Sequence, residues 1–317
     1  MKWSPLRVGG LLVVFLSTTG CHLIPPTHPV VFTSQPDLPQ LLDHIGRSSD
    51  SIQRLSADGI QLRIEGAPVS LRSSIDFERP NRFKLTGSFM ATSELDVGSN
   101  EQFLWIWGRH APGALLYVRH DQYGQTIANQ LMPVPPSWLI EALGVLSIDP
   151  LGQYTGPIVR EDGNLEIKSQ WIRQGEPLWR TWVVDPKYGF IVEQQVRDAQ
   201  GSLLASVWAS DHRHDPEWNV SLPRHLDVQI NMPGEELPFR MSLDIGDYTI
   251  NGLSPTDPQF WDMPDPGNYP AYDLADPNVY RKLQRMTAVP APRGVADLRG
   301  EFRPQYRGYS QSPTMRR

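Results

Sequence analysis

The residue with the most specific chemistry is Cys21, the only cysteine in a chain of 317 residues. Lys2 and Arg7 precede a short apolar run, Val8–Leu16, and small residues follow it up to Gly20. This order is typical of a secretory signal over residues 1–20, and the run is too short for a membrane span of about 20 residues. A cysteine directly after Gly20 predicts a bacterial lipobox, with cleavage before Cys21, a diacylglycerol on its thiol and an acylated new amino terminus. The alternative is an ordinary signal peptide followed by an unmodified thiol.

A second group of residues with possible chemistry is the run DHRHD at residues 211–215. On a strand, His212 and His214 would lie on the same face, and two imidazoles could bind zinc. No third ligand is identifiable, and Pro216 indicates a strand end or loop. The favoured interpretation is a solvated turn, so we predict no metal site.

Catalytic motifs are absent from the sequence. It contains no H-E-x-x-H, no G-x-S-x-G and no phosphate-binding glycine loop. The carboxylate pairs Glu161-Asp162 and Glu235-Glu236 lie beside Gly or Pro and are typical of turns. We therefore predict that the protein is not an enzyme and needs no cofactor, with a His-dependent hydrolase as a minor alternative.

Composition and charge narrow the choice further. A hydrophobic content of 39% and ten tryptophans indicate a substantial core, and a single cysteine allows no internal disulfide. The net charge is -6, but residues 281–317 carry nine Lys/Arg and two Asp/Glu, which leaves -15 for residues 21–280. An acidic body is unsuited to nucleic acid, because phosphate neutralisation dominates that affinity. The basic end could contact anionic lipid or cell-wall polymer, or simply be solvated.

The elements expected along the chain are few helices and many strands. The lipidated cysteine and a Pro-rich tether occupy residues 21–36, and apolar periodicity predicts helices at 37–55 and 135–145. Alternating patterns separated by Gly, Pro, Asn and Asp predict antiparallel hairpins. The predicted strands are 59–65, 69–78, 82–90, 93–98, 102–107, 114–120, 156–162, 164–172, 178–185, 190–197, 203–211, 224–231 and 239–248. Together these predict a mainly β (α+β) domain, a single large curved antiparallel sheet over residues 37–264, with a Pro/Arg-rich disordered tail at 265–317.

The order of several short motifs resembles a known family. After the first helix come RPNRFKL at residues 79–85, the polar turn and aromatic strand SNEQFLWIW at 99–107, DYTIN at 247–251 and FWDMP at 260–264. In this order they resemble the LolA/LolB-type lipoprotein-localisation superfamily and its outer-membrane lipoprotein-sorting relatives. The resemblance implies an incomplete β-barrel of about eleven strands with covering helices, whose concave apolar face holds acyl chains.

The residues themselves agree in part with a hydrophobic groove. Several strands are apolar on both faces, and such strands must be covered on both sides or line a cavity. A plain core beneath helices remains the alternative. The candidate groove residues are Phe103, Trp105, Trp107, Trp138, Trp171, Trp182 and Trp208.

The sequence therefore predicts a lipid-anchored envelope protein that binds acyl chains, lipoproteins or other hydrophobic ligands. His22 favours the periplasmic face of the outer membrane, because Asp at that position favours inner-membrane retention in enterobacteria. The alternative is a non-catalytic scaffold whose basic end binds cell-wall polymer or a partner protein. The sequence leaves the cargo and the oligomeric state open.

Overall fold

One continuous sheet of fifteen strands organises the chain in a computed structural model. The structure describes residues 28–283, apart from 111, 125, 127, 132, 136–137, 174–175, 234–235, 258 and 280. Along the sheet the strands follow the order β15-β6-β5-β4-β3-β2-β1-β13-β12-β11-β10-β9-β8-β7, with β14 paired to the start of β1. The bounds of the first six strands are β1 (Arg54–Ile64), β2 (Leu71–Glu78), β3 (Arg82–Phe89), β4 (Thr92–Ser99), β5 (Phe103–Gly108) and β6 (Ala114–Arg119). The others are β7 (Gln153–Val159), β8 (Leu165–Arg173), β9 (Glu176–Val184), β10 (Ile191–Arg197), β11 (Leu203–Asp215), β12 (Val220–Ile230), β13 (Phe239–Asp244), β14 (Tyr248–Ile250) and β15 (Ala271–Asp273).

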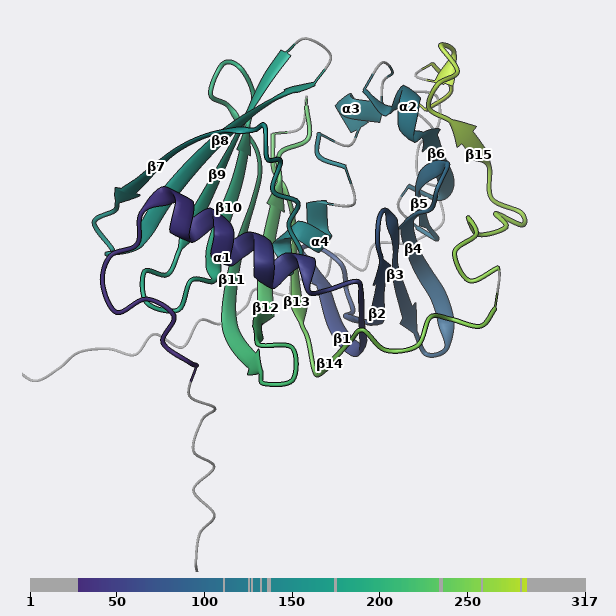
Figure 1. Cartoon of the computed structure of the whole chain (residues 1–317). Helices are drawn as coiled ribbons and strands as arrows, with labels where there is room; N and C mark the ends of the chain where they lie inside the picture. The colour runs from purple at the N-terminus through teal and green to yellow at the C-terminus, as the bar shows by residue number, and fades with distance from the viewer. Residues whose placement is uncertain are drawn as a thin grey trace, which may run out of the picture.

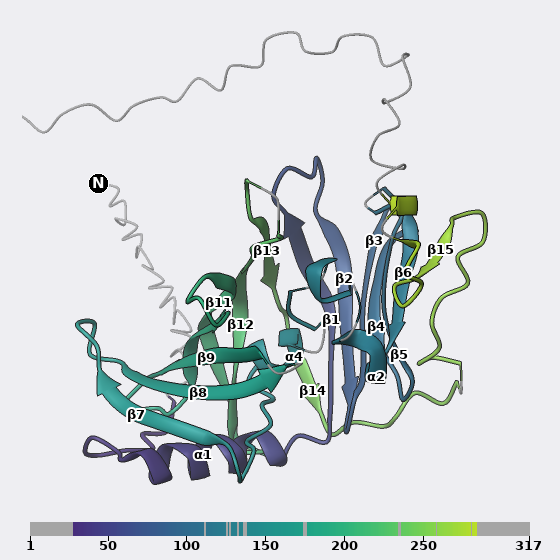
Figure 2. The ribbon, with the colours of Figure 1, turned by 90° about the horizontal axis from the view of Figure 1, so that it is seen from above.

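The sheet consists of two antiparallel meanders that meet in its middle. Strands β1–β6 form one half and β7–β13 the other, and β1 pairs with β13 in the register Leu62↔Leu243. Seen from above, the sheet bends into an open arc with α4 inside the bend (Figure 2). The predicted single curved antiparallel sheet, not closed into a barrel, is confirmed, with more strands than the predicted eleven.

The first helix, α1 (Leu38–Asp50), begins with a capping box. Gln40 N donates to Asp37 Oδ1 at 2.9 Å, and Asp37 N donates to Gln40 Oε1 at 3.0 Å. The helix ends five residues before the predicted limit at 55, because Ile52 and Leu55 turn into the sheet core instead. In Figure 1, α1 crosses in front of the strands of the second half.

The remaining helices are short and follow β6. They are α2 (His120–Tyr123), α3 (Ala128–Leu131) and α4 (Trp138–Ala142). Leu104 and Leu116 on β5 and β6 pack with Tyr123 and Ala128, so α2 and α3 cover one face of these strands. The segment around α4 packs in the main core, which both meanders share. The predicted helix at 135–145 is thus present, in shorter form.

The C-terminal segment covers the outer face of the first half. Trp105 and Trp107 pack with Met263 and Tyr269, and Trp261 is buried. Beyond that, β15 pairs in parallel with β6 and Leu274 is buried behind it. The packed body therefore extends past the predicted boundary at 264 and includes residues of the predicted tail at 265–317. Residues 284–317 lie outside the described part of the chain.

Candidate ligand-binding site

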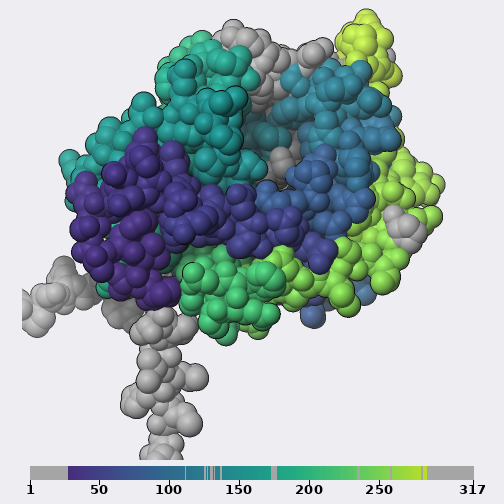
Figure 3. Space-filling model, in the orientation of Figure 1, coloured from purple at the N-terminus to yellow at the C-terminus, as the bar shows by residue number. Residues whose placement is uncertain are grey.

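The concave face of the sheet is apolar and is covered by α4 with its flanking residues. Its strand residues come from both meanders, which follows from the alternation of inward and outward side chains. Trp138, Leu139 and Leu143 of the covering segment are buried against them. In the space-filling view, the surface is hollowed above α1, between the blue strands of the first half and the teal strands of the second (Figure 3). The principal strand residues beneath the segment are Leu55, Ile60, Leu62, Ile75, Phe83, Val196, Val207, Leu226, Val228 and Leu243.

A polar group lies under this apolar cover, at the joint between α4 and the second meander. Arg180 on β9 contacts the carboxylate of Glu141 on α4, with Nη1 to Oε2 at 3.1 Å. Gln194 on β10 donates from Nε2 to the backbone carbonyl of Glu141 at 2.7 Å. The guanidinium of Arg180 also lies 4.6 Å from the ring centre of Trp171 and 5.6 Å from that of Trp182. Two polar contacts and two aromatic rings thus fix the end of α4 to the sheet.

Burial and the charge of Arg180 have opposite effects on Glu141 at this joint. Burial raises the pKa of Glu141 above its ordinary value, and the positive charge of Arg180 acts in the opposite direction. Desolvation therefore offsets part of the attraction between the two side chains.

Several buried polar atoms in this region make no hydrogen bond within the described residues. Such atoms are rare in native proteins, and each needs a physical explanation. Two belong to Arg180 and Gln194, which already hold Glu141 through their other atoms. The unpartnered atoms on or under the covering segment are Arg180 Nε, Gln194 Oε1, Trp138 Nε1 and Trp182 Nε1.

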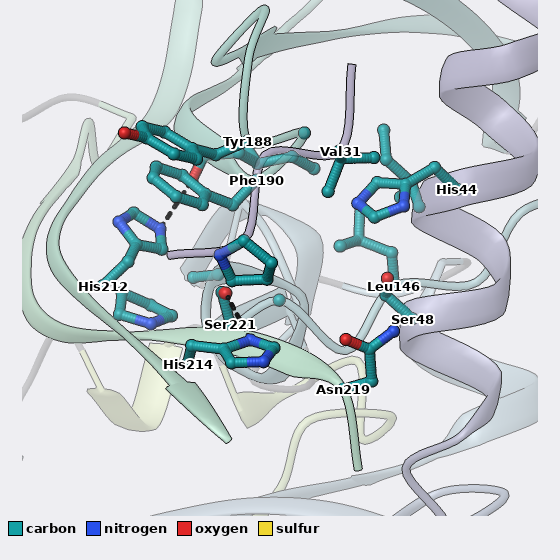
Figure 4. Close-up of a pocket in the computed structure, with 17 residues that line it drawn as sticks. Val31, His44, Ser48, Leu146, Tyr188, Phe190, His212, His214, Asn219 and Ser221 are labelled. Atoms are coloured by element: carbon teal, nitrogen blue, oxygen red, sulfur yellow. Dashed lines mark hydrogen bonds between the residues drawn. The ribbon is translucent and has the colours of Figure 1, made fainter. Parts of the chain in front are cut away.

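A small pocket of about 70 Å³ opens at the end of the same interface. It lies between α1, the turn after α4, the strands β10–β12 and the segment before α1 (Figure 4). Among its lining residues, His44 projects from α1 and Leu146 follows α4, while His212 and His214 come from β11. The pocket is about half the size of a cavity of roughly 150 Å³ that is known to bind benzene.

The predicted histidine pair lies on β11, not in a solvated turn. His212 stacks on Phe190 with ring centres 3.9 Å apart, and its Nε2 lies 3.2 Å from the carbonyl oxygen of Ile191. Burial lowers the pKa of His212 to about 4, so the ring is neutral at pH 7. His214 Nδ1 lies 3.4 Å from Ser221 Oγ. Within the described ranges no three His, Cys, Asp or Glu side chains group as metal ligands.

The structure distributes the seven predicted groove residues over separate regions. Trp138 is part of the covering segment, Trp171 packs against the main core, and Trp182 packs beneath α1. Trp208 is 45% exposed on the outer face. Under the C-terminal segment, on the far side of the first meander, lie Phe103, Trp105 and Trp107.

Sequence reasoning missed Glu141, Arg180 and Gln194, which are ordinary polar residues of a helix and two strands. A hint was present, because Arg180 interrupts the strongly apolar run from Leu178 to Val184. Cys21 and Gly20, with the predicted signal, lie outside the described residues. No helix in the described part of the chain is both long and apolar enough to cross a bilayer.

No family model matches the chain, and no curated protein matches it by sequence. Solved structures do match it by fold. The matches include the LolA superfamily. One is a LolA superfamily protein from Nitrosomonas europaea, 12% identical, covering 67% of this chain and 94% of its own, with a TM-score of 0.41.

Two further matches have similar extent. A domain described as an outer membrane lipoprotein-sorting protein, from Vibrio parahaemolyticus, is 9% identical and covers 68% of this chain and 93% of its own, with a TM-score of 0.45. A DUF1329 family protein from Desulfovibrio piger is 10% identical and covers 68% of this chain and 92% of its own, with a TM-score of 0.44. The likeness concerns fold alone, so function is argued below from the residues of this chain.

Proposed function

We propose that the protein is a lipid-anchored, non-enzymatic envelope protein that binds an acyl chain, free or carried by a lipoprotein, on the concave face of its sheet. One observation supports the proposal above all. The apolar concave face is covered by a short helical segment, and the contact beneath its end contains unpartnered polar atoms of Arg180 and Gln194. Binding sites for small apolar molecules have this composition, a largely apolar wall with a few polar groups.

In the described conformation the covering segment is itself packed on the apolar strand residues of the concave face. The ligand must therefore displace this segment and take its place on the strands. The exchange replaces one apolar contact by another, so its free-energy change is smaller than that of exposing the face to water.

Displacement of α4 would also free the polar groups at the joint. Once Glu141 leaves, Arg180 presents a guanidinium between Trp171 and Trp182, and Gln194 presents its amide. A guanidinium and an amide can bind the carboxylate of a fatty acid or the ester carbonyl of an acylated peptide. We propose that Arg180 and Gln194 bind the polar end while the strand residues hold the chain.

The proposed anchor is the diacylglycerol on Cys21, at the periplasmic face of the outer membrane. Each buried methylene contributes about 0.8 kcal/mol, so two or three chains hold the protein at the bilayer effectively permanently. The proposed cargo would then be taken up close to that bilayer. Labelled palmitate should be incorporated by the wild-type chain and not by Cys21→Ser.

The ligand proposal is tested by native mass spectrometry of the Cys21→Ser chain expressed without its signal. We expect copurified lipid, or saturable uptake of a fluorescent fatty acid that palmitate displaces. Repeated absence of both would contradict the proposal. Removal of residues 281–317 should leave this uptake unchanged, whereas the alternative scaffold function would lose its binding to polymer or partner.

A further inference from the structure

The segment that precedes α1 is docked on the domain and is not a free tether. Val31 N and Phe32 N both donate to the carbonyl of Lys187, at 3.0 and 3.1 Å, in the turn between β9 and β10. Phe32 packs with the cluster beneath α1 and contacts the ring of His44, with ring centres 5.5 Å apart. Pro36 is buried.

His28 fixes the start of this docked segment. Its ring centre lies 5.5 Å from that of Tyr188 and 5.4 Å from that of Phe190, which in turn stacks on His212. The contacts at residues 28–36 therefore begin at the first described residue. Only residues 21–27 remain between the predicted lipid and the domain.

The length of that remainder determines how near the domain is to the bilayer. Residues 22–36 could span about 50 Å when extended, but the seven residues 21–27 span about 25 Å at most. A domain of this size is about 45 Å across. The surface beside His28 can therefore rest on the bilayer, while the opposite side of the domain cannot reach it.

The same surface exposes apolar side chains. Val30 and Val159 line one open groove of about 480 Å³ with Phe32 and Pro186. The exposed fractions of Val30, Ile158 and Val159 are 49%, 57% and 53%. The last two end β7, the edge strand of the sheet. Val30, Ile158 and Val159 are called the edge patch below.

We infer that the edge patch is a bilayer-contact surface, held against the membrane that carries the lipidated Cys21. This inference rests on the proposed lipidation. The patch is too small to bind alone, but a short anchor raises its effective concentration at the bilayer to about the millimolar range. The domain would then sit with the β9–β10 turn and the end of β7 at the lipid surface.

The charges around the edge patch indicate which lipid composition it can contact. Arg160 lies among Asp162, Glu166 and Glu193, at 3.6, 4.0 and 3.0 Å, and Glu161 is also at this edge. Lys187 lies over the ring of Tyr188, at 4.9 Å. The surface has no excess of positive charge, so contact should not require anionic lipid.

In the test, the chain is attached covalently to a bilayer without the cellular lipidation. The chain starting at Cys21 is coupled through its sole thiol to a maleimide lipid in phosphatidylcholine vesicles, and amide hydrogen exchange is compared with that of the uncoupled chain. We expect slower exchange over Gln153–Val159 and residues 28–34 on attachment only, and the same result with added phosphatidylglycerol. Because coupling replaces lipidation, a failed experiment contradicts the bilayer contact and leaves the proposed lipidation to the palmitate test.

Three variants and one control sharpen the result. An insertion of about 20 Gly and Ser residues between positions 27 and 28 should abolish the protection by lengthening the tether. Ile158→Ser with Val159→Ser should abolish it too, and Val30→Ser should weaken it without altering β7. Met90→Ser, at an 84% exposed residue of the β3–β4 turn, should leave it intact. Protection that survives the insertion, appears only elsewhere or never appears would overturn the inference.

Discussion

The two halves of the sheet contain similar apolar strands, but the outer faces of these strands are covered to different extents. In the first meander, Trp105 is fully buried on the outer face, beneath the C-terminal segment, and its indole donates to Asp96 Oδ1 at 2.7 Å. In the second meander, the outer-face tryptophans Trp179 and Trp208 remain 40% and 45% exposed. An apolar strand pattern thus predicts two apolar faces, but it does not say which of them the rest of the chain covers.

The difference also separates structural from functional roles. At β5 and β6 the first meander is sealed on both faces, by α2 and α3 on one and by residues around Met263 and Tyr269 on the other. The inner face of the second meander is covered by α1, and the core that it shares with β1–β3 is covered by α4. Exchange of a cover for a ligand is therefore expected on this shared core beneath α4, and β5 and β6 serve as a rigid support.

The largest expected effect is the loss of Trp105. Trp105→Ala should lower the free energy of unfolding by about 4 kcal/mol, because it leaves a cavity and removes the indole hydrogen bond to the buried Asp96, which keeps its ion pair with Lys84. Burial already raises the pKa of Asp96. The measurement is chemical denaturation of the variant and the parent chain. A loss below about 1 kcal/mol would contradict the claim that the C-terminal segment seals Trp105 against the first meander.

A smaller loss in the free energy of unfolding is expected when the pH is lowered. His212 has a pKa of about 4 in the folded chain and about 6.5 when unfolded, so the unfolded chain binds the proton first. Its share of the free energy of unfolding should be constant above about pH 6.5 and fall by about 3 kcal/mol as the pH drops to 4. His212→Phe keeps the stacking on Phe190 and should flatten this part of the profile. An unchanged profile would contradict the assignment to His212.

A smaller loss of stability again is expected from breaking the contact between Arg180 and Glu141 beneath α4. Arg180→Met leaves Glu141 without its partner and should cost about 2 kcal/mol, less than a fully buried pair because both side chains are partly exposed. Adding Glu141→Gln to Arg180→Met should recover part of the loss. Thermal unfolding of Arg180→Met, Glu141→Gln and the double variant measures the coupling, and strictly additive losses would show that the pair does not hold α4.

The smallest effect is predicted for the outer face of the second meander. Trp208→Ser should change the free energy of unfolding by less than about 1 kcal/mol, because this side chain is 45% exposed. The result is read against Trp105→Ala under the same denaturation conditions. Equal losses at the two tryptophans would abolish the contrast between the halves.

Most strands could be predicted from the sequence, because alternation and turn residues are local signals. The strand predicted at 82–90 is found at Arg82–Phe89, and the one at 190–197 at Ile191–Arg197. Helix α1 was predicted from Asp37 and its apolar stripe, but its end at Asp50 depends on the tertiary contacts of Ile52.

What could not be predicted depends on contacts distant in sequence. The proline-rich stretches around Pro29 and Pro266 were predicted as a tether and a tail, yet both dock on the sheet through Phe32 and Tyr269. Composition reports how flexible an isolated segment is, and not whether a surface elsewhere binds it. For the same reason, Glu141 and Arg180 carry no signal until the fold brings them together.

The central claim is that the concave face of the sheet takes an acyl chain in place of α4. The most direct test is a titration of a fluorescent fatty acid into the Cys21→Ser chain and the same chain with Arg180→Met and Glu141→Gln. We predict saturable uptake in the first, with palmitate displacing the probe, and weaker binding in the second, because it lacks the guanidinium proposed to bind the carboxylate. No uptake by either chain, with both shown to be folded, would contradict the account.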